Sequence, residues 1–284
     1  MKIKKVLFLL TIAMVMVQFA SAQNASIDIA KIGDNDKAGH YLTIRGFNMY
    51  YETYGAGQPL LLIHGNGGSI SNFMYQVPYF SKSYKVIVAD SRAQGKSIDT
   101  GDSLSYEMMA DDFNALLDAL HLDSCDVIGW SDGAVNALLL AIRHPVKVKK
   151  LAITGAKLSS DTNAVDATAN EWALKYNESL GKIKQTPEVK NRSKVARLLS
   201  YQPHLSIAQL SSVHCPTLVI AGDHDVILPK HTLLIASSIP KSYLWILPGA
   251  GNSIPVYFKD QFDEVVGNFF RNPYKKIEGL DRFN

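Results

Sequence analysis

Residues 129–133 read GWSDG, the G-x-S-x-G spacing that can present a serine as a nucleophile. An apolar run precedes the motif and a helical pattern follows it, as in a tight strand-to-helix turn. Such a turn lifts the serine clear of the sheet, and small residues must flank it because the backbone crowds itself there. The N-terminus of the following helix favours developing negative charge. We therefore predict Ser131 as a nucleophile; the alternative is an ordinary glycine-rich turn.

Two further segments carry residue types suited to chemistry. HGNGG at residues 64–68 follows an apolar run, and its glycines allow the backbone to approach another group closely. A phosphate-binding loop is the alternative, but the Lys and Ser or Thr of a P-loop are missing. GDHD at residues 222–225 places two carboxyls after a later apolar run. No His, Cys and carboxylate set has the spacing of metal ligands, so we expect no metal site.

Short apolar runs alternate with helical patterns from residue 60 onward, and these elements must position the motifs. Strands that are apolar on both faces and separated by helices indicate a mostly parallel sheet with helices on both faces. Residues 40–54 instead read as an antiparallel hairpin at one edge. The predicted strands cover 60–63, 85–89, 126–129, 151–153, 217–221 and 243–247, and the predicted helices cover 72–81, 109–120 and 134–144. The fold class is α/β.

One stretch interrupts this alternation. Residues 156–212 contain a polar segment and helical pieces around 172–180 and 193–201, without a strand pattern. So long a stretch inside an α/β domain is most simply an inserted helical cap. We therefore divide the chain into a signal peptide (1–22), an α/β core (23–155 and 213–284) and a helical cap (156–212).

The motifs in this order resemble the α/β-hydrolase superfamily from about Tyr41 to Phe270. They are HGNGG, then Asp90 with GKS at 95–97, then GWSDG, then GDHD. The chain looks most similar to the cap-bearing branch, which holds esterases, lactonases, carbon–carbon bond hydrolases and serine-dependent haloperoxidases. The resemblance implies an eight-stranded sheet, a small-molecule substrate and no cofactor.

The resemblance also implies roles for individual residues. Ser131 would be the nucleophile, and the backbone N–H groups of Asp132 and Asn66 would form the oxyanion hole, with Gly67 as an alternative to Asn66. The acid would be Asp225, with Asp223 as its competitor; a helix cap is another possible role for this carboxyl.

The chain departs from the family at the general base. The family places a histidine just after the last strand, in a loop reading roughly Gly-x-Gly-His, whereas this chain has Asn252 there. An amide cannot accept the serine's proton at neutral pH. His224, beside the acid, is the first alternative base, and the other histidines are better explained as structural. The sequence thus predicts a serine hydrolase for an ester-like carbonyl substrate with impaired catalysis; the alternative is an inactive ligand-binding protein.

The N-terminus predicts export. Three lysines precede an apolar run over 6–20, and small residues at 20–22 suit cleavage before Gln23. The run is shorter than the roughly 20 residues of a spanning helix. We expect a secreted or periplasmic protein without stable membrane insertion after cleavage.

Removal of residues 1–22 takes the formal net charge from +3 to zero, which gives no electrostatic reason to expect a nucleic-acid partner. Two cysteines remain, Cys125 and Cys215. The strand order that the resemblance implies separates them by two strand spacings, roughly 9.6 Å. Because this exceeds the approximately 7 Å Cα limit for a disulfide, we expect free thiols.

Overall fold

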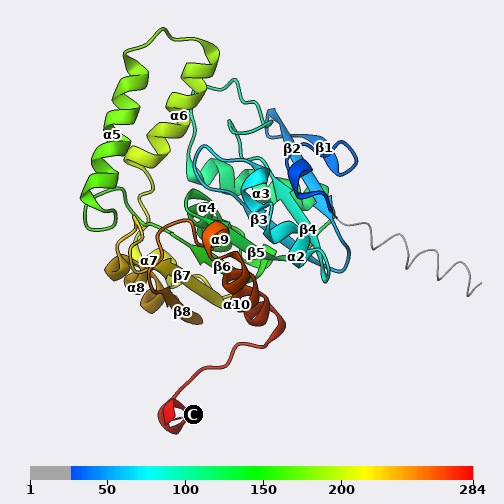
Figure 1. Cartoon of the computed structure of the whole chain (residues 1–284), viewed down its shortest axis with the longest axis vertical. Coiled ribbons are helices and arrows are strands. Elements are labelled where there is room, and N and C mark those ends of the chain that lie inside the picture. The colour runs from blue at the N-terminus through cyan, green and yellow to red at the C-terminus, as the bar shows by residue number, and fades with distance from the viewer. Residues whose placement is uncertain (1–26, 284) are drawn as a thin grey trace, which may run out of the picture.

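The chain forms one twisted sheet of eight strands with helices on both faces, as the computed structural model in Figure 1 shows for residues 27–283. The expected signal peptide lies outside these described residues. The strands are β1 (Gly39–Ile44), β2 (Phe47–Tyr54), β3 (Gln58–Ile63), β4 (Tyr84–Ala89), β5 (Cys125–Trp130), β6 (Val148–Thr154), β7 (Thr217–Gly222) and β8 (Ser242–Leu247). The helices are α2 (Gln76–Phe80), α3 (Tyr106–Ala119), α4 (Asp132–Arg143), α5 (Ala167–Gly181), α6 (Pro187–Tyr201), α7 (Ile207–Leu210), α8 (Pro229–Ser238), α9 (Ile254–Tyr257) and α10 (Lys259–Arg271).

The strand order is β1-β2-β4-β3-β5-β6-β7-β8. The pairs β1–β2 and β2–β4 are antiparallel, and all other pairs are parallel. The predicted hairpin at the sheet edge and the predicted mostly parallel sheet are therefore confirmed.

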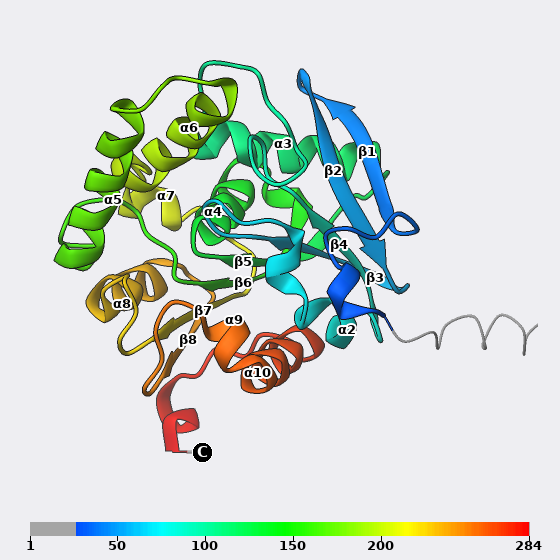
Figure 2. The ribbon, with the colours of Figure 1, turned by 45° about the horizontal axis from the view of Figure 1, so that its top comes forward.

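The sheet separates two apolar layers. Leu61 and Ile63 of β3 pack on the side covered by α3, α4 and α8, whereas Leu60 and Leu62 pack on the side of α2, α9 and α10. Figure 2 shows these two groups of helices on opposite sides of the sheet. Each fully buried Leu stabilises the fold by about 1.5–3 kcal/mol. Alternate residues of β3 thus pack into opposite layers, which explains why residues 60–63 are all apolar.

Helix boundaries follow local capping, with one correction. The side-chain oxygen of Ser105 accepts a hydrogen bond from Met108 N (3.1 Å), so the predicted cap of α3 is confirmed. The predicted helix over 72–81 is wrong as a continuous element: a 3₁₀ turn, Ile70–Phe73, precedes the short α2. Pro78 explains the break, because its ring would clash with the carbonyl of residue 74 in a continuous helix. In α2 it lies in the first turn, where its missing N–H is harmless.

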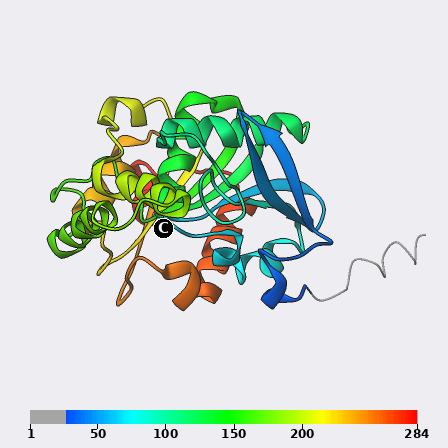
Figure 3. The same ribbon diagram turned by 90° about the horizontal axis from the view of Figure 1, so that it is seen from above.

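Residues 156–212, the cap segment, contain α5, α6 and α7. Asp166 caps α5, and Thr186 with Pro187 begins α6, so both helices are longer than their apolar patterns indicated. α5 and α6 pack against each other (Figure 3), whereas α7 packs on α4 and α8. The division into core and cap stays a prediction.

The two cysteines lie on either side of β6. Cys125 begins β5, and Cys215 precedes β7; both are free thiols. Within the part of the chain that the structure describes, no helix has the length and apolar character required to cross a membrane.

Candidate active site

Ser131 lies on the turn between β5 and α4 with a strained backbone, φ 56° and ψ −120°. Its N–H donates to the carbonyl of Thr154 at the end of β6 (2.8 Å). A Cβ on Gly129 would overlap the carbonyl of Gly133, and a Cβ on Gly133 would overlap the carbonyl of Ile63. Both flanking positions therefore require glycine. The structure places Ser131 on a strand-to-helix elbow, the context that the sequence indicated.

Two backbone donors in the segments around Ser131 are unused: Asp132 follows it directly, and Asn66 follows Gly65, where an added Cβ would lie 3.2 Å from the Ser131 Cβ. Among residues 27–283, neither the Asn66 N–H nor the Asp132 N–H has a hydrogen-bond acceptor. The Gly67 N–H instead donates to Oε1 of Gln94 (2.6 Å). This contact separates the two candidates that the sequence left open, because Asn66 is free to donate and Gly67 is occupied. Asp132 is also the first residue of α4, where the helix dipole favours negative charge.

His64 orders the loop that carries Asn66. Its Nδ1 donates to the carbonyl of Gly65 (2.8 Å), and its Nε2 accepts from the N–H of Ser91 (2.9 Å). Burial lowers the pKa of His64, so the neutral ring with one donor and one acceptor fits both contacts. Asp90 holds the neighbouring backbone by accepting from Ile70 N (2.8 Å). The motif residues His64 and Asp90 thus support the loop rather than face a ligand.

Of the two candidate carboxyls, Asp225 is turned toward Asn252. Asp225 is 5% exposed, and its Oδ1 accepts from Nδ2 of Asn252 (2.9 Å) and from Ile227 N (3.0 Å). Burial raises the pKa of Asp225. Asp223 instead pairs with His224 (2.7 Å) at the surface. The residue capping α8 is Leu228, so neither carboxyl caps that helix.

Asn252 is held by contacts from two sides. Its carbonyl oxygen accepts from Nε1 of Trp130 (2.8 Å), and its side-chain amide donates to Asp225. The other carboxylate oxygen of Asp225, Oδ2, is buried and has no hydrogen-bond donor among the described residues. Asp225 therefore keeps one carboxylate oxygen without a donor among the described residues, and the residue that binds its other oxygen is an amide.

All eight histidines lie within residues 27–283, and none lines the cavity at Ser131. His231 accepts from Leu158 N (3.0 Å), and His144 contacts Asp111 (2.8 Å). The side chain of His224, the first alternative base, is 78% exposed and bound to Asp223. The remaining four, His40, His121, His204 and His214, are exposed. The structure thus places no imidazole where it could take a proton from Ser131.

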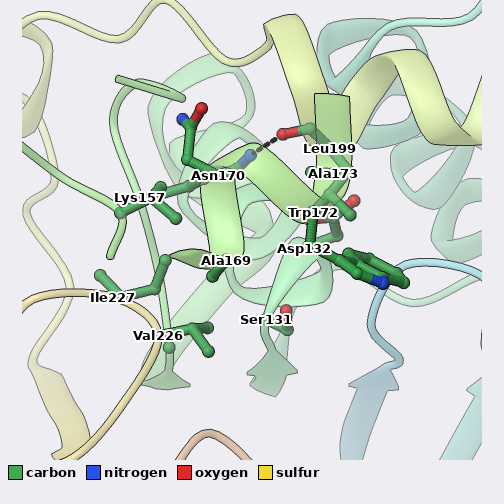
Figure 4. Close-up of a pocket in the computed structure, with 12 residues that line it drawn as sticks. Ser131, Asp132, Lys157, Ala169, Asn170, Trp172, Ala173, Leu199, Val226 and Ile227 are labelled. Atoms are coloured by element: carbon green, nitrogen blue, oxygen red, sulfur yellow. Dashed lines mark hydrogen bonds between the residues drawn. The ribbon is translucent and has the colours of Figure 1, made fainter. Parts of the chain in front are cut away.

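A cavity of about 140 Å³ opens at Ser131. Its lining comes from the ends of β5, β6 and β7 and from α5 and α6, and it is mostly apolar (Figure 4). The lining residues are Ser131, Asp132, Gly155, Lys157, Val165, Ala169, Asn170, Trp172, Ala173, Leu199, Val226 and Ile227. An engineered cavity of about 150 Å³ holds benzene, so a compact organic molecule fits this space.

Sequence reasoning missed Lys157, Asn170 and Trp172 as cavity residues. They belong to the stretch between β6 and the end of α5, which carries no motif. Their position depends on how the cap segment folds over the sheet, including a β-bridge between Val165 and Ile227. A lysine in an apolar setting, three residues after Thr154, was the one available signal.

Comparisons with known proteins agree with this architecture. A family model described as the α/β hydrolase fold matches residues 58–194. The chain is 28% identical to the 2-hydroxymuconate semialdehyde hydrolase of Pseudomonas sp. (strain CF600), covering 83% of this chain and 95% of that relative. It is 25% identical to the serine hydrolase BPHL of Mus musculus, covering 81% and 85%.

Among solved structures, an enzyme that degrades N-acyl homoserine lactones superposes with a TM-score of 0.66 at 25% identity, covering 81% of this chain and 100% of the other. The chain thus has the α/β hydrolase fold, and the two relatives that it matches over most of its length are hydrolases by name.

Proposed function

We propose that this protein is a serine hydrolase that attacks an ester-like carbonyl through Ser131. The observation that carries the proposal is the elbow itself: a strained serine borders a cavity, beside two backbone N–H groups that have no acceptor among residues 27–283. Such donors stabilise the negative oxygen that forms when a serine adds to a carbonyl, and each is worth about 3–4 kcal/mol of barrier. The names of the relatives, a semialdehyde hydrolase and a lactone-degrading enzyme, support a carbonyl substrate.

We propose further that turnover is slow because Asn252 stands in the place of the general base. Loss of a triad member can reduce kcat by a factor on the order of 10⁶, while an oxyanion hole and substrate binding retain roughly 10³–10⁴ over water. The contact between Asn252 and Asp225 supports this assignment, because the amide makes the hydrogen bond to the acid that a histidine would make.

Labelling with a fluorophosphonate tests the nucleophile directly. The wild-type protein should form one adduct, mapped by mass spectrometry to Ser131, and Ser131→Ala should form none. Ser253→Ala, at a neighbouring serine beside Asn252, is the matched control and should label like the wild type. An adduct elsewhere, or none in the folded wild-type protein, would remove Ser131 from the proposed role.

The second candidate is a ligand-binding protein without turnover. It is favoured by the lining of the cavity, which contains none of the eight histidines, all of which lie within residues 27–283. Hydrolysis of p-nitrophenyl acetate separates the two candidates. Slow hydrolysis that Ser131→Ala abolishes supports the enzyme, whereas equal background rates in both proteins support the binding protein.

We also propose that the protein is exported. The support is the N-terminal pattern of lysines, apolar run and small residues at 20–22. The site does not depend on this proposal.

A further inference from the structure

Lys157 is a buried cation without a carboxylate partner. It is 3% exposed, and its Nζ donates to the carbonyl of Leu199 and to Oγ of Ser160, both at 2.7 Å. It forms no ion pair with any carboxylate of residues 27–283. An ammonium has three donors, so one N–H remains without a protein acceptor. Burial lowers the pKa of this lysine.

Two other basic groups near the cap segment, the buried Arg92 and the partly buried Lys194, are paired with carboxylates. Arg92 binds Asp112 (2.7 Å) and Asp99 (3.1 Å), and Lys194 binds Asp99 (2.8 Å). A buried charge normally requires such a partner, because neutral acceptors replace only part of its lost hydration. Lys157 therefore differs from these groups, because none of the ion pairs formed by residues 27–283 includes it, and Asp132 acts on it only through its charge and not through a direct contact.

The position of Lys157 indicates where the counter-charge would come from. It lines the same cavity as Ser131, and most of the lining between them is apolar. In Figure 4 the hydrogen bond from the Lys157 amine to Leu199 lies beside Asn170, at the end of the view opposite Ser131. The other charged lining residue, Asp132, follows Ser131 directly, and its carboxylate accepts from Nδ2 of Asn66 (2.7 Å). An anion in the cavity would therefore be drawn to the Lys157 end.

We propose that Lys157 binds a carboxylate carried by the substrate, so that the substrate is a compact ester-like molecule with a second, anionic end. That the substrate carries a reacting carbonyl rests on the proposed function. That Lys157 binds a carboxylate does not depend on it. The size of the cavity limits the molecule to a short linker between the two groups. The amine is bound to Leu199 and Ser160, and in Figure 4 it lies across the view from Ser131, so its role is to position the substrate rather than to accept the serine's proton.

Binding to the Ser131→Ala protein tests the inference without turnover. The two ligands are monomethyl succinate and methyl succinamate, which have nearly the same shape and differ in the charge of one end. By isothermal titration, the anion should bind at least tenfold more tightly than the amide. Equal affinities, or no binding of the anion, would overturn the proposal without any lysine variant.

Lys157→Met in the same background should reduce this preference to about one, because it keeps the apolar stem and removes the charge. The matched control is Lys175→Met on α5. It causes the same change in net charge, but the lysine that it removes is exposed and paired with Glu171. The control should keep the tenfold preference. A preference that survives Lys157→Met would assign the anion to another group. Because Ser131 labelling is measured separately, a failure here leaves the serine hydrolase proposal standing.

Discussion

Replacing Asn252 by histidine should create the proton acceptor that the site lacks. The main chain of residue 252 is held by the bond from Trp130, which the substitution leaves in place. The amide Nδ2 now lies 2.9 Å from Oδ1 of Asp225, which is the contact that an imidazole Nδ1–H would make. The buried Oδ2 of Asp225 has no donor within the part of the chain that the structure describes, so this carboxylate can accept a further hydrogen bond. A histidine at position 252 can therefore form the hydrogen bond to Asp225 without a large movement of Asp225 or Trp130.

The expected gain follows from what a positioned base contributes. General-base catalysis is worth about 10²–10⁴-fold, which is about 3–5 kcal/mol of barrier at roughly 1.4 kcal/mol per tenfold. We expect the lower end, at least a hundredfold, because the pocket is packed around an amide rather than an imidazole. Burial raises the pKa of Asp225, and a neighbouring imidazolium would favour its ionised form. The rate should rise with pH as the new imidazole loses its proton, near its ordinary pKa of about 6.5 or somewhat above.

The assay is hydrolysis of p-nitrophenyl acetate between pH 5 and 9, with melting curves to show that each variant is folded. Asn252→Gln is the matched control, since it lengthens the side chain without supplying a base, and it should show no gain. Combining Asn252→His with Ser131→Ala should abolish the gain, because the imidazole would have no hydroxyl to activate. A gain that persists in the double variant would show the histidine acting alone. No gain in a folded protein that still labels at Ser131 would refute the assignment of position 252.

Three further outcomes are expected. Asp263 on α10 is buried, accepts from Gln76 (3.0 Å), and has its pKa raised by burial to about 7 from 3.8. Because the pKa is higher in the folded state, the contribution of Asp263 to stability is fully present below pH 4 and is lost as the pH rises through 7. Asp263→Asn should therefore increase the free energy of unfolding at pH 8, by at most about 4 kcal/mol at 1.36 kcal/mol per pKa unit, and change it little at pH 4. Urea unfolding at both pH values checks this, and an equal effect at both would contradict it. Gly133→Ala should lower the free energy of unfolding by about 3 kcal/mol, the upper end for overpacking, because the added methyl group would overlap the backbone carbonyl of Ile63. The control is Gly181→Ala, where nothing lies within 4 Å of the added Cβ, and it should be neutral or stabilising. The intact mass of the exported protein should match a chain that begins at Gln23, and a mass that includes residues 1–22 would contradict cleavage.

The parts of the site that sequence predicted are those built from short contiguous motifs. The elbow at Ser131 follows from local sterics, since both glycines of GWSDG are required within a few residues of the serine. The sheet was predictable for a similar reason, because the central residues of β3, β5 and β7 are buried on both faces and are therefore mostly apolar. Asp225 could be preferred over Asp223 only through the resemblance, and the structure turns its carboxylate toward Asn252.

The parts that sequence did not predict depend on distant contacts. The N–H of Gly67 is occupied by Gln94, a residue 27 positions away, and no local pattern indicates this contact. Lys157 becomes a cavity residue only because α6 brings the carbonyl of Leu199 to its amine, across 42 positions. The prediction of a helix over 72–81 failed for a local reason instead, because Pro78 within this range does not allow a continuous helix.

Two features of the cavity are unfavourable in the folded chain alone, and they bear differently on the two candidate functions. The lone ammonium of Lys157 is offset by any bound anion, so both a hydrolase and a binding protein would make use of it. The backbone of Ser131 at φ 56° costs on the order of 1–3 kcal/mol for a residue other than glycine. Binding an anion at Lys157 does nothing to offset that strain, and a glycine at 131 would remove it while keeping the cavity. The strain is accounted for only where the serine hydroxyl itself is used, which favours chemistry at Ser131 over binding alone.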